Sequence, residues 1–137
     1  MSHSLKLLDQ QVIVVTGASG IGLATAQQAV KHGAKVLLAA RSLKLQDIEA
    51  ALNEAGGEAI AVTADVSSVS DVASIAEAAI DNYGRIDMWV NNAGVAIYGR
   101  LEEVSERDSR CLFDINFWGV VNGSLAALPI CERQEVR

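Results

Sequence analysis

The stretch Gln11-Val-Ile-Val-Val-Thr-Gly-Ala-Ser-Gly-Ile-Gly-Leu-Ala-Thr-Ala26 decides the fold of this chain. A β-branched run ends at Thr16-Gly17, and Gly20 and Gly22 then lead into an alanine-rich segment with helical spacing. Strand, glycine turn and helix in this order bring backbone N–H groups and the positive end of a helix dipole to a place where a phosphate binds. Such a turn also fits a plain strand-to-helix connection, so the rest of the chain must decide between the two interpretations.

The composition favours helices packed on a buried parallel sheet. Half of the 137 residues are hydrophobic while aromatic residues make up only 4%, so Ala, Val, Ile and Leu must form the core. This length predicts one domain over residues 1–137. The net charge of −6 argues against a nucleic-acid partner, which would require clustered Lys and Arg.

Other sequence features exclude several classes of protein. The two cysteines, Cys111 and Cys131, have no CxxC spacing and no nearby histidine cluster, so we interpret them as buried or bystander thiols and predict no metal site. The N-terminus lacks the pattern of a secretion signal, and no stretch approaches the length of a membrane span. We therefore expect a soluble, cytoplasmic α/β protein with no membrane partner.

Strands and helices alternate along the chain. The expected strands are residues 12–15, 35–40, 58–63 and 86–90. The expected helices are residues 21–32, 43–55, a segment capped by Ser68 or Ser70 that runs to Tyr83, and a long helix that Ser105 and Asp108 open and that runs to Leu128. Residues 95–104 are expected to form an irregular loop, and Pro129, the only proline, is expected to close the last helix.

This alternation predicts a Rossmann-type α/β fold, a doubly wound parallel sheet with strand order 3-2-1-4. A crevice is expected between the first and fourth strands, outside the carboxyl ends of the strands. Three marked segments fall at those ends: residues 16–22, Asp65-Val66 and residues 91–94. Their convergence on one crevice favours a ligand-binding role for the glycine turn.

These segments resemble the classical short-chain dehydrogenase/reductase family. Thr16-Gly17 with Gly20-Ile21-Gly22, Asp65-Val66, Asn91-Asn92-Ala93-Gly94 and Asn116 occur in the order of that family and near its spacing, and the resemblance spans Lys6 to about Pro129. The resemblance implies an oxidoreductase that transfers a hydride between an alcohol and a carbonyl through a nicotinamide cofactor. It also implies a small-molecule substrate and a possible homo-oligomer.

The resemblance assigns roles to individual residues. The implied cofactor-binding residues are Gly17, Ser19, Ile21 and Gly22 at the phosphates, Asp65 and Val66 at the adenine, and Asn91, Ala93 and Gly94 at the ribose and nicotinamide. For Asn91, a side chain that fixes the loop by bonding local backbone is a second role that we expect alongside the first. Asn116 resembles the helix asparagine that kinks its helix and supports a proton-relay water, which makes it the one implied catalytic residue in this chain, with an ordinary polar helix residue as the alternative.

Arg41 points to NADP rather than NAD as the cofactor. NAD-binding turns usually carry Asp or Glu at the end of the second strand, where it bonds the ribose 2′-hydroxyl. Here that position is Ala40 and the next residue is Arg41, whose guanidinium matches a 2′-phosphate. The alternative is a solvated arginine at the end of a strand.

Two departures from the family pattern bear on function. Only Ala18 and Ser19 separate Gly17 from Gly20, one residue fewer than in the family, which changes the direction of the amides that face a pyrophosphate. The family's catalytic serine and Tyr-x-x-x-Lys pair have no counterpart, because Tyr83 and Tyr98 both precede the long helix and neither has a lysine four residues later. We therefore expect an incomplete chain, truncated after the fourth strand and its long helix, that is inactive alone.

The tail suggests an origin for this incompleteness. Ile-Cys-Glu-Arg-Gln-Glu-Val-Arg, residues 130–137, is charged and does not lead toward another strand. Residues 129–137 can be back-translated into a DNA sequence, and one nucleotide can be added at the proline codon. The shifted frame then reads Pro-His-Leu-Arg-Ala-Ala-Gly-Gly-Ala, which is similar to the segment that precedes the fifth strand in the family. The hypothesis is that the tail is out of frame, and a gene without a downstream frame that encodes the serine and the Tyr-x-x-x-Lys pair would disprove it.

Two alternatives to an oxidoreductase stay open on the sequence. One is a non-catalytic nucleotide-binding module that kept the crevice without the chemistry. The other is a non-functional truncated remnant whose exposed sheet edge favours aggregation.

Overall fold

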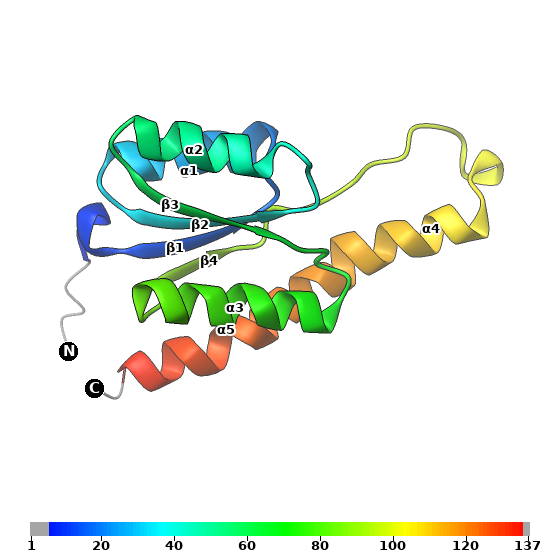
Figure 1. Ribbon diagram of the computed structural model, residues 1–137. Coiled ribbons are helices and arrows are strands. Elements are labelled where there is room, and N and C mark those ends of the chain that lie inside the picture. The colour runs from blue at the N-terminus through cyan, green and yellow to red at the C-terminus, as the bar shows by residue number, and fades with distance from the viewer. Residues whose placement is uncertain (1–5, 136–137) are drawn as a thin grey trace.

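A computed structural model describes residues 6–135, and it shows a four-stranded sheet with helices on both faces (Figure 1). The strands are β1 (Val12–Thr16), β2 (Lys35–Ala40), β3 (Glu58–Thr63) and β4 (Met88–Val90). All pairs are parallel and the order is β3-β2-β1-β4, so the predicted strand order is confirmed. The tail considered above includes residues 136–137, which lie outside the described residues.

The helices follow the strands in the predicted alternation. They are α1 (Gly20–Lys31), α2 (Leu45–Glu54), α3 (Val69–Tyr83), α4 (Glu106–Phe113) and α5 (Gly119–Glu135), with a π-helical turn (Asp114–Trp118) between the last two. The described residues also contain two 3-10 turns. One is Leu8–Gln10 before β1, and the other is Leu101–Glu103 inside the segment expected to be irregular. Ser68 caps α3 as expected, because its hydroxyl accepts a hydrogen bond from the Asp71 amide.

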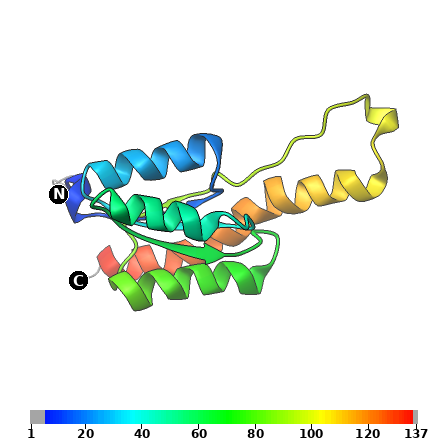
Figure 2. The ribbon, with the colours of Figure 1, turned by 45° about the horizontal axis from the view of Figure 1, so that its top comes forward.

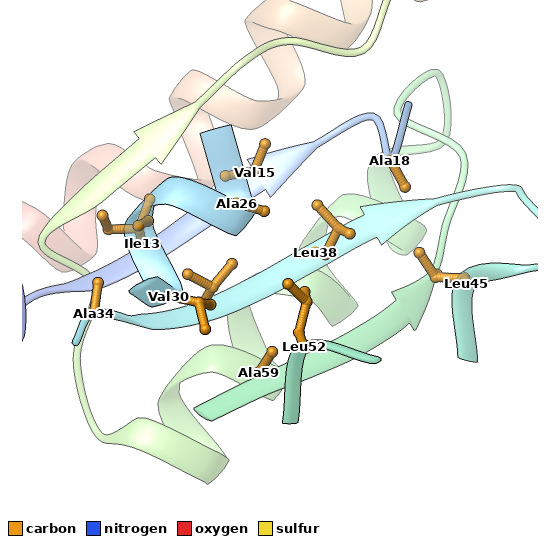
Figure 3. Close-up of a cluster of buried hydrophobic side chains, with 12 residues drawn as sticks. Ile13, Val15, Ala18, Ala26, Val30, Ala34, Leu38, Leu45, Leu52 and Ala59 are labelled. Carbon is orange, nitrogen blue, oxygen red and sulfur yellow. The ribbon is translucent and has the colours of Figure 1, made fainter. Parts of the chain in front are cut away.

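Two apolar layers hold the helices to the sheet. On one face α1 and α2 cover side chains such as Ile13, Val15 and Leu38, which pack against Val30 and Leu52 (Figure 3). On the other face α3 and α5 cover a second cluster, so the sheet is buried from both sides (Figure 2). This double burial explains why the strands are continuous apolar runs rather than alternating ones.

The fourth strand is shorter than predicted, because side chains make most of the hydrogen bonds at residues 86 and 87. The Asp87 carboxylate accepts the Val12 amide at 2.9 Å, and the Gln134 side-chain amide bonds both the N–H and the C=O of Ile86, at 2.9 and 2.7 Å. Only one backbone bond, from the Asp87 amide to the Val12 carbonyl at 2.9 Å, joins this segment to β1 before Met88, and the side-chain contacts add to it. The expected strand over residues 86–90 is therefore correct only from Met88 onward.

The prediction that Pro129 closes the last helix is wrong, because α5 continues to Glu135 with Pro129 inside it. Proline removes the bond to the carbonyl four residues earlier, but that carbonyl belongs to Leu125, whose residue is 65% exposed and within reach of water. Beyond the proline, Ile130 packs on the sheet and Gln134 bonds Ile86. Tertiary contacts thus extend the helix past a residue that ends helices locally.

The expectation that no stretch reaches the length of a membrane span is also wrong. Residues Glu106–Glu135 form a continuous 30-residue helical segment that is long and apolar enough, by length and composition, to cross a membrane, and only 22% of its most apolar stretch is buried. The continuation of the helix past Pro129 adds to this length. Its C-terminal half nevertheless packs on α3 and the sheet through Ala126 and Ile130, as a helix of a layered domain does.

Candidate cofactor-binding cleft

A cleft of about 310 Å³ lies at the carboxyl ends of the strands, where the sequence predicts a crevice. Each strand end supplies part of its lining. The lining residues are Gly17 to Ser19 after β1, Ala39 to Ser42 at the end of β2, Ala64 to Val66 after β3, Ala93 to Val95 after β4, and Ile115 from the π-helical turn. The volume falls at the low end of the range for small-molecule sites.

The glycine turn after β1 is shaped by close backbone approach. Gly17 has a φ of +89°, and a Cβ there would lie 2.7 Å from the Asn92 side-chain nitrogen and 3.1 Å from the Ala93 Cα. A Cβ on Gly22 would overlap the Gly17 carbonyl oxygen. Both positions therefore require glycine, one for its left-handed conformation and both for space.

The turn delivers the N-terminus of α1 to the cleft. Ser19 is the N-cap residue with extended backbone, and its side chain makes no capping bond. The first N–H groups of the helix therefore have no intrahelical acceptor, and the helix dipole adds positive potential there. A helix N-terminus of this kind attracts an anionic group.

A hydrogen-bond lock joins the loop after β1 to the loop after β4. The Thr16 hydroxyl accepts the backbone N–H groups of Asn92 and Ala93, both at 3.1 Å, and donates to the Val90 carbonyl at 3.3 Å. In return the Asn92 side chain donates to the Thr16 carbonyl at 3.0 Å and to that of Gly17 at 3.4 Å. The lock fixes the two loops that form opposite parts of the cleft.

Thr16 and Asn92 were absent from the residues that the sequence assigns to the site. Both lie inside the quoted motifs, so the motifs mark the right segments while the pairing between them is invisible before the strands are in register. Thr16 is only 2% exposed, and a buried hydroxyl at the end of an apolar strand is the one signal that could have identified it.

Asp65 is held rigidly at the rim of the cleft. One carboxylate oxygen accepts the Ser67 amide at 2.9 Å and the Ser67 hydroxyl at 2.7 Å, and the Asp65 amide donates to the Asp71 carboxylate at 2.9 Å. The hydrogen bond from the Ser67 hydroxyl, helped by the Ser67 amide and the Arg41 charge, lowers the pKa of Asp65 despite a partial loss of hydration. Asp65 is therefore an anion at neutral pH, with its second oxygen left to face Arg41.

Arg41 reaches this carboxylate from the end of β2. Its Nη1 lies 4.0 Å from the second oxygen of Asp65, and its side chain is 60% exposed. The structure thus brings together Arg41 and Asp65, which are separated in the sequence by a helix and a strand. A basic and an acidic side chain face each other at the same end of the cleft.

Seven of the predicted cofactor-binding residues line the cleft, and three do not. The lining includes Gly17, Ser19, Arg41, Asp65, Val66, Ala93 and Gly94. Ile21 is 80% exposed outside the lining, and Gly22 is buried behind the turn.

Asn91 faces the helix layer instead of the cleft. Its side chain accepts the indole N–H of Trp89 at 3.0 Å and donates to the Ser124 hydroxyl at 3.2 Å, and Gly123 leaves room for it. The expected bond from Asn91 to local loop backbone is therefore replaced by a bond to α5. Its observed role is to join β4 to that helix.

Asn116 lies in the π-helical turn and fixes the loop that follows β4. Its side-chain oxygen accepts the Val95 amide at 2.8 Å, and its side-chain nitrogen donates to the Val95 carbonyl at 2.7 Å. A π turn is a local irregularity of the helix, in line with the kink that the family resemblance implies at this residue. Because Val95 lines the cleft, Asn116 shapes the cleft from the second layer of residues.

Comparisons with known proteins agree with this geometry. The family model described as short chain dehydrogenase matches residues 11–136. The chain therefore belongs to the short-chain dehydrogenase family, as the sequence motifs predict.

Individual relatives show the same relationship. The uncharacterized oxidoreductase YxnA of Bacillus subtilis (strain 168) is 51% identical over 126 residues, which are 90% of this chain and 35% of YxnA. The solved short-chain dehydrogenase/reductase from Burkholderia phymatum, in complex with NAD, is 36% identical with a TM-score of 0.91 over 95% of this chain and 47% of that chain. The alcohol dehydrogenase from the archaeon Thermococcus sibiricus, complexed with 5-hydroxy-NADP, is 35% identical with a TM-score of 0.84 over 90% of this chain and 54% of that chain. The chain thus spans between about a third and about half of the length of these relatives.

Proposed function

We propose that this chain is the cofactor-binding part of an NADP(H)-dependent oxidoreductase that interconverts a small alcohol and a carbonyl compound. The observation that carries the proposal is the convergence of the glycine turn, Arg41 and Asp65 on one cleft at the carboxyl ends of the strands. Both Arg41 and Asp65 lie at the surface of the cleft, so neither side chain is part of the apolar core.

The lining of the cleft suits a dinucleotide, because one end of the cleft can hold the phosphates and the other end can hold a base. The N-terminus of α1 behind Gly17 and Ser19 would hold the pyrophosphate, and the position of Asp65 and Val66 suits the amino group of an adenine. Ala93 and Gly94 add a flat backbone surface without bulky side chains. When bound, the nicotinamide would supply or accept the hydride.

Arg41 is the basis for preferring NADP over NAD. The strand end carries Ala40 where an acidic side chain would bond a ribose 2′-hydroxyl, and the exposed guanidinium of Arg41 is placed to pair with a 2′-phosphate. The solved relatives bind either cofactor, because one structure holds NAD and another 5-hydroxy-NADP. The proposed preference for NADP therefore rests on Ala40 and Arg41 of this chain.

Asn116 enters the proposal as a positioning residue. Both polar ends of its side chain bond the Val95 backbone, so it acts on the site through the loop that carries Ala93 and Gly94. The Tyr-x-x-x-Lys pair on which family catalysis rests has no counterpart among these 137 residues. We accordingly expect the chain to bind cofactor without turning over substrate.

A thermal-shift titration of the purified 137-residue chain tests the binding. A ligand that binds only the folded state stabilises it by about 2.7 kcal/mol at a hundredfold excess over Kd, so NADPH should raise the Tm by several degrees. Inorganic phosphate at the same concentration is the control and should have little effect. No stabilisation by NADPH or NADH would contradict the proposal and favour a non-functional remnant.

A further inference from the structure

We propose that Asp65 is a specificity-determining residue that weakens the binding of a 2′-phosphate by competing for Arg41. The inference rests on the proposed function, because it concerns the same cleft and the same cofactor. It assigns to Asp65 a second role besides accepting a hydrogen bond from the adenine.

The geometry holds the acidic partner still. Ser67 binds one oxygen of the Asp65 carboxylate twice, and Asp71 binds the Asp65 backbone amide, so these bonds favour the position in which the carboxylate faces Arg41. The second oxygen stays 4.0 Å from the guanidinium. An arriving phosphate therefore meets a cation whose nearest counter-charge is fixed in place.

The charge of the cleft makes this competition matter. Among the residues that line it, Arg41 and Asp65 are the only charged ones, and their charges cancel. A dinucleotide phosphate must rely on backbone N–H groups and on this one shared cation. A 2′-phosphate that pairs with Arg41 is repelled by the carboxylate on the other side of the same guanidinium.

Asp65→Asn separates the charge from the structural role. The amide oxygen of asparagine can still accept the Ser67 amide and hydroxyl, so the turn after β3 is preserved, while the negative charge beside Arg41 is gone. The Asp65 backbone amide and its bond to Asp71 are unaffected. The substitution therefore changes the electrostatics of the rim more than its shape.

Two fragments isolate the effect, namely adenosine 5′-monophosphate and adenosine 2′,5′-bisphosphate. They share the adenine and the ribose and differ by the 2′-phosphate, so the ratio of their Kd values reports the preference for that group. Calorimetry on the full chain should show a ratio that favours the bisphosphate about three- to tenfold more strongly in Asp65→Asn than in the unchanged protein. A change in adenine binding alone would affect both fragments and cancel in the ratio.

Two further variants serve as controls. Glu77→Gln removes one negative charge from the exposed face of α3, away from the cleft lining, and should leave the ratio unchanged. Arg41→Ala should remove the preference for the bisphosphate with either Asp or Asn at position 65, because the shared cation is gone.

The outcomes separate this inference from the proposed function. If both fragments bind and the ratio is the same in Asp65→Asn as in the unchanged protein, the competition is disproved while the cofactor site stands. A gain of similar size in Glu77→Gln would also disprove it, because net charge would then explain the effect. If neither fragment binds the unchanged protein, the proposed function fails and this inference fails with it.

Discussion

Thr16 shows how one buried hydroxyl organises the site at the scale of single residues. It is the only polar residue in the buried core of the described chain, and its hydroxyl bonds three backbone groups, one at the end of β4 and two in the loop that follows. A buried polar atom is retained only when its partners are satisfied. The cost of burying Thr16 is thus offset by the order that it imposes on the cleft.

Replacing Thr16 with valine tests this role. Valine keeps the shape but removes the acceptor of the Ala93 amide and leaves the Asn92 amide with the Val90 carbonyl alone, so we expect a loss of about 2 kcal/mol in the free energy of unfolding. Urea unfolding followed by circular dichroism measures it. The same variant should bind NADPH more weakly, because the loop after β4 is no longer tied to the glycine turn.

Thr25→Val is the matched control. The Thr25 hydroxyl bonds only the Ile21 carbonyl within its own helix, so its removal should cost less than about 0.5 kcal/mol. Equal losses for the two variants would show that the bonds across the two loops contribute nothing specific.

Individual site residues could be predicted where a backbone conformation or a charge required them. Gly17 belongs to this group, because its left-handed turn demands glycine, and Arg41 lies in the lining of the cleft as its place after β2 predicts. The pairing of Arg41 with a 2′-phosphate stays a prediction. The orientation of Asn91 toward α5 and the pairing of Asn92 with Thr16 depend on which strands become neighbours. That information arises only when the sheet is assembled.

At the scale of elements, burial decided how well the boundaries were predicted. The expected bounds of β2 and β3 match the structure, because both are apolar runs between a glycine turn and a polar residue. The start of β4 and the end of α5 were missed for a shared reason. Both depend on contacts between Ile86 and Gln134, which are 48 residues apart.

Pro129→Ala tests the account of the extended helix. Alanine restores an N–H for the Leu125 carbonyl and removes the ring clash, while the unfolded chain gains some freedom, so we expect a net stabilisation of about 2 kcal/mol. The neighbouring exposed variant Leu128→Ala is the control and should change stability by less than about 0.5 kcal/mol. A destabilised Pro129→Ala would mean that the proline ring contributes packing against α3 that outweighs the missing bond.

At the scale of the whole molecule, the parallel topology explains why distant motifs form one site. Parallel strands put all their carboxyl ends at one edge, so the segments after β1, β2, β3 and β4 meet there without any direct sequence relation. The fold class and the crevice were predictable from the order of elements alone. The rim pair of Arg41 and Asp65 was not, because the sequence pattern around each residue points to a separate part of the cofactor.

The central claim, that the cleft binds a nicotinamide dinucleotide with a preference for NADP, is tested most directly by isothermal titration calorimetry of the 137-residue chain. NADP and NAD are titrated side by side into the unchanged protein and into Arg41→Ala. We expect tighter binding of NADP by the unchanged protein and no preference in the variant, because the guanidinium is the group that would distinguish the two cofactors. Equal or tighter binding of NAD by the unchanged protein would contradict it.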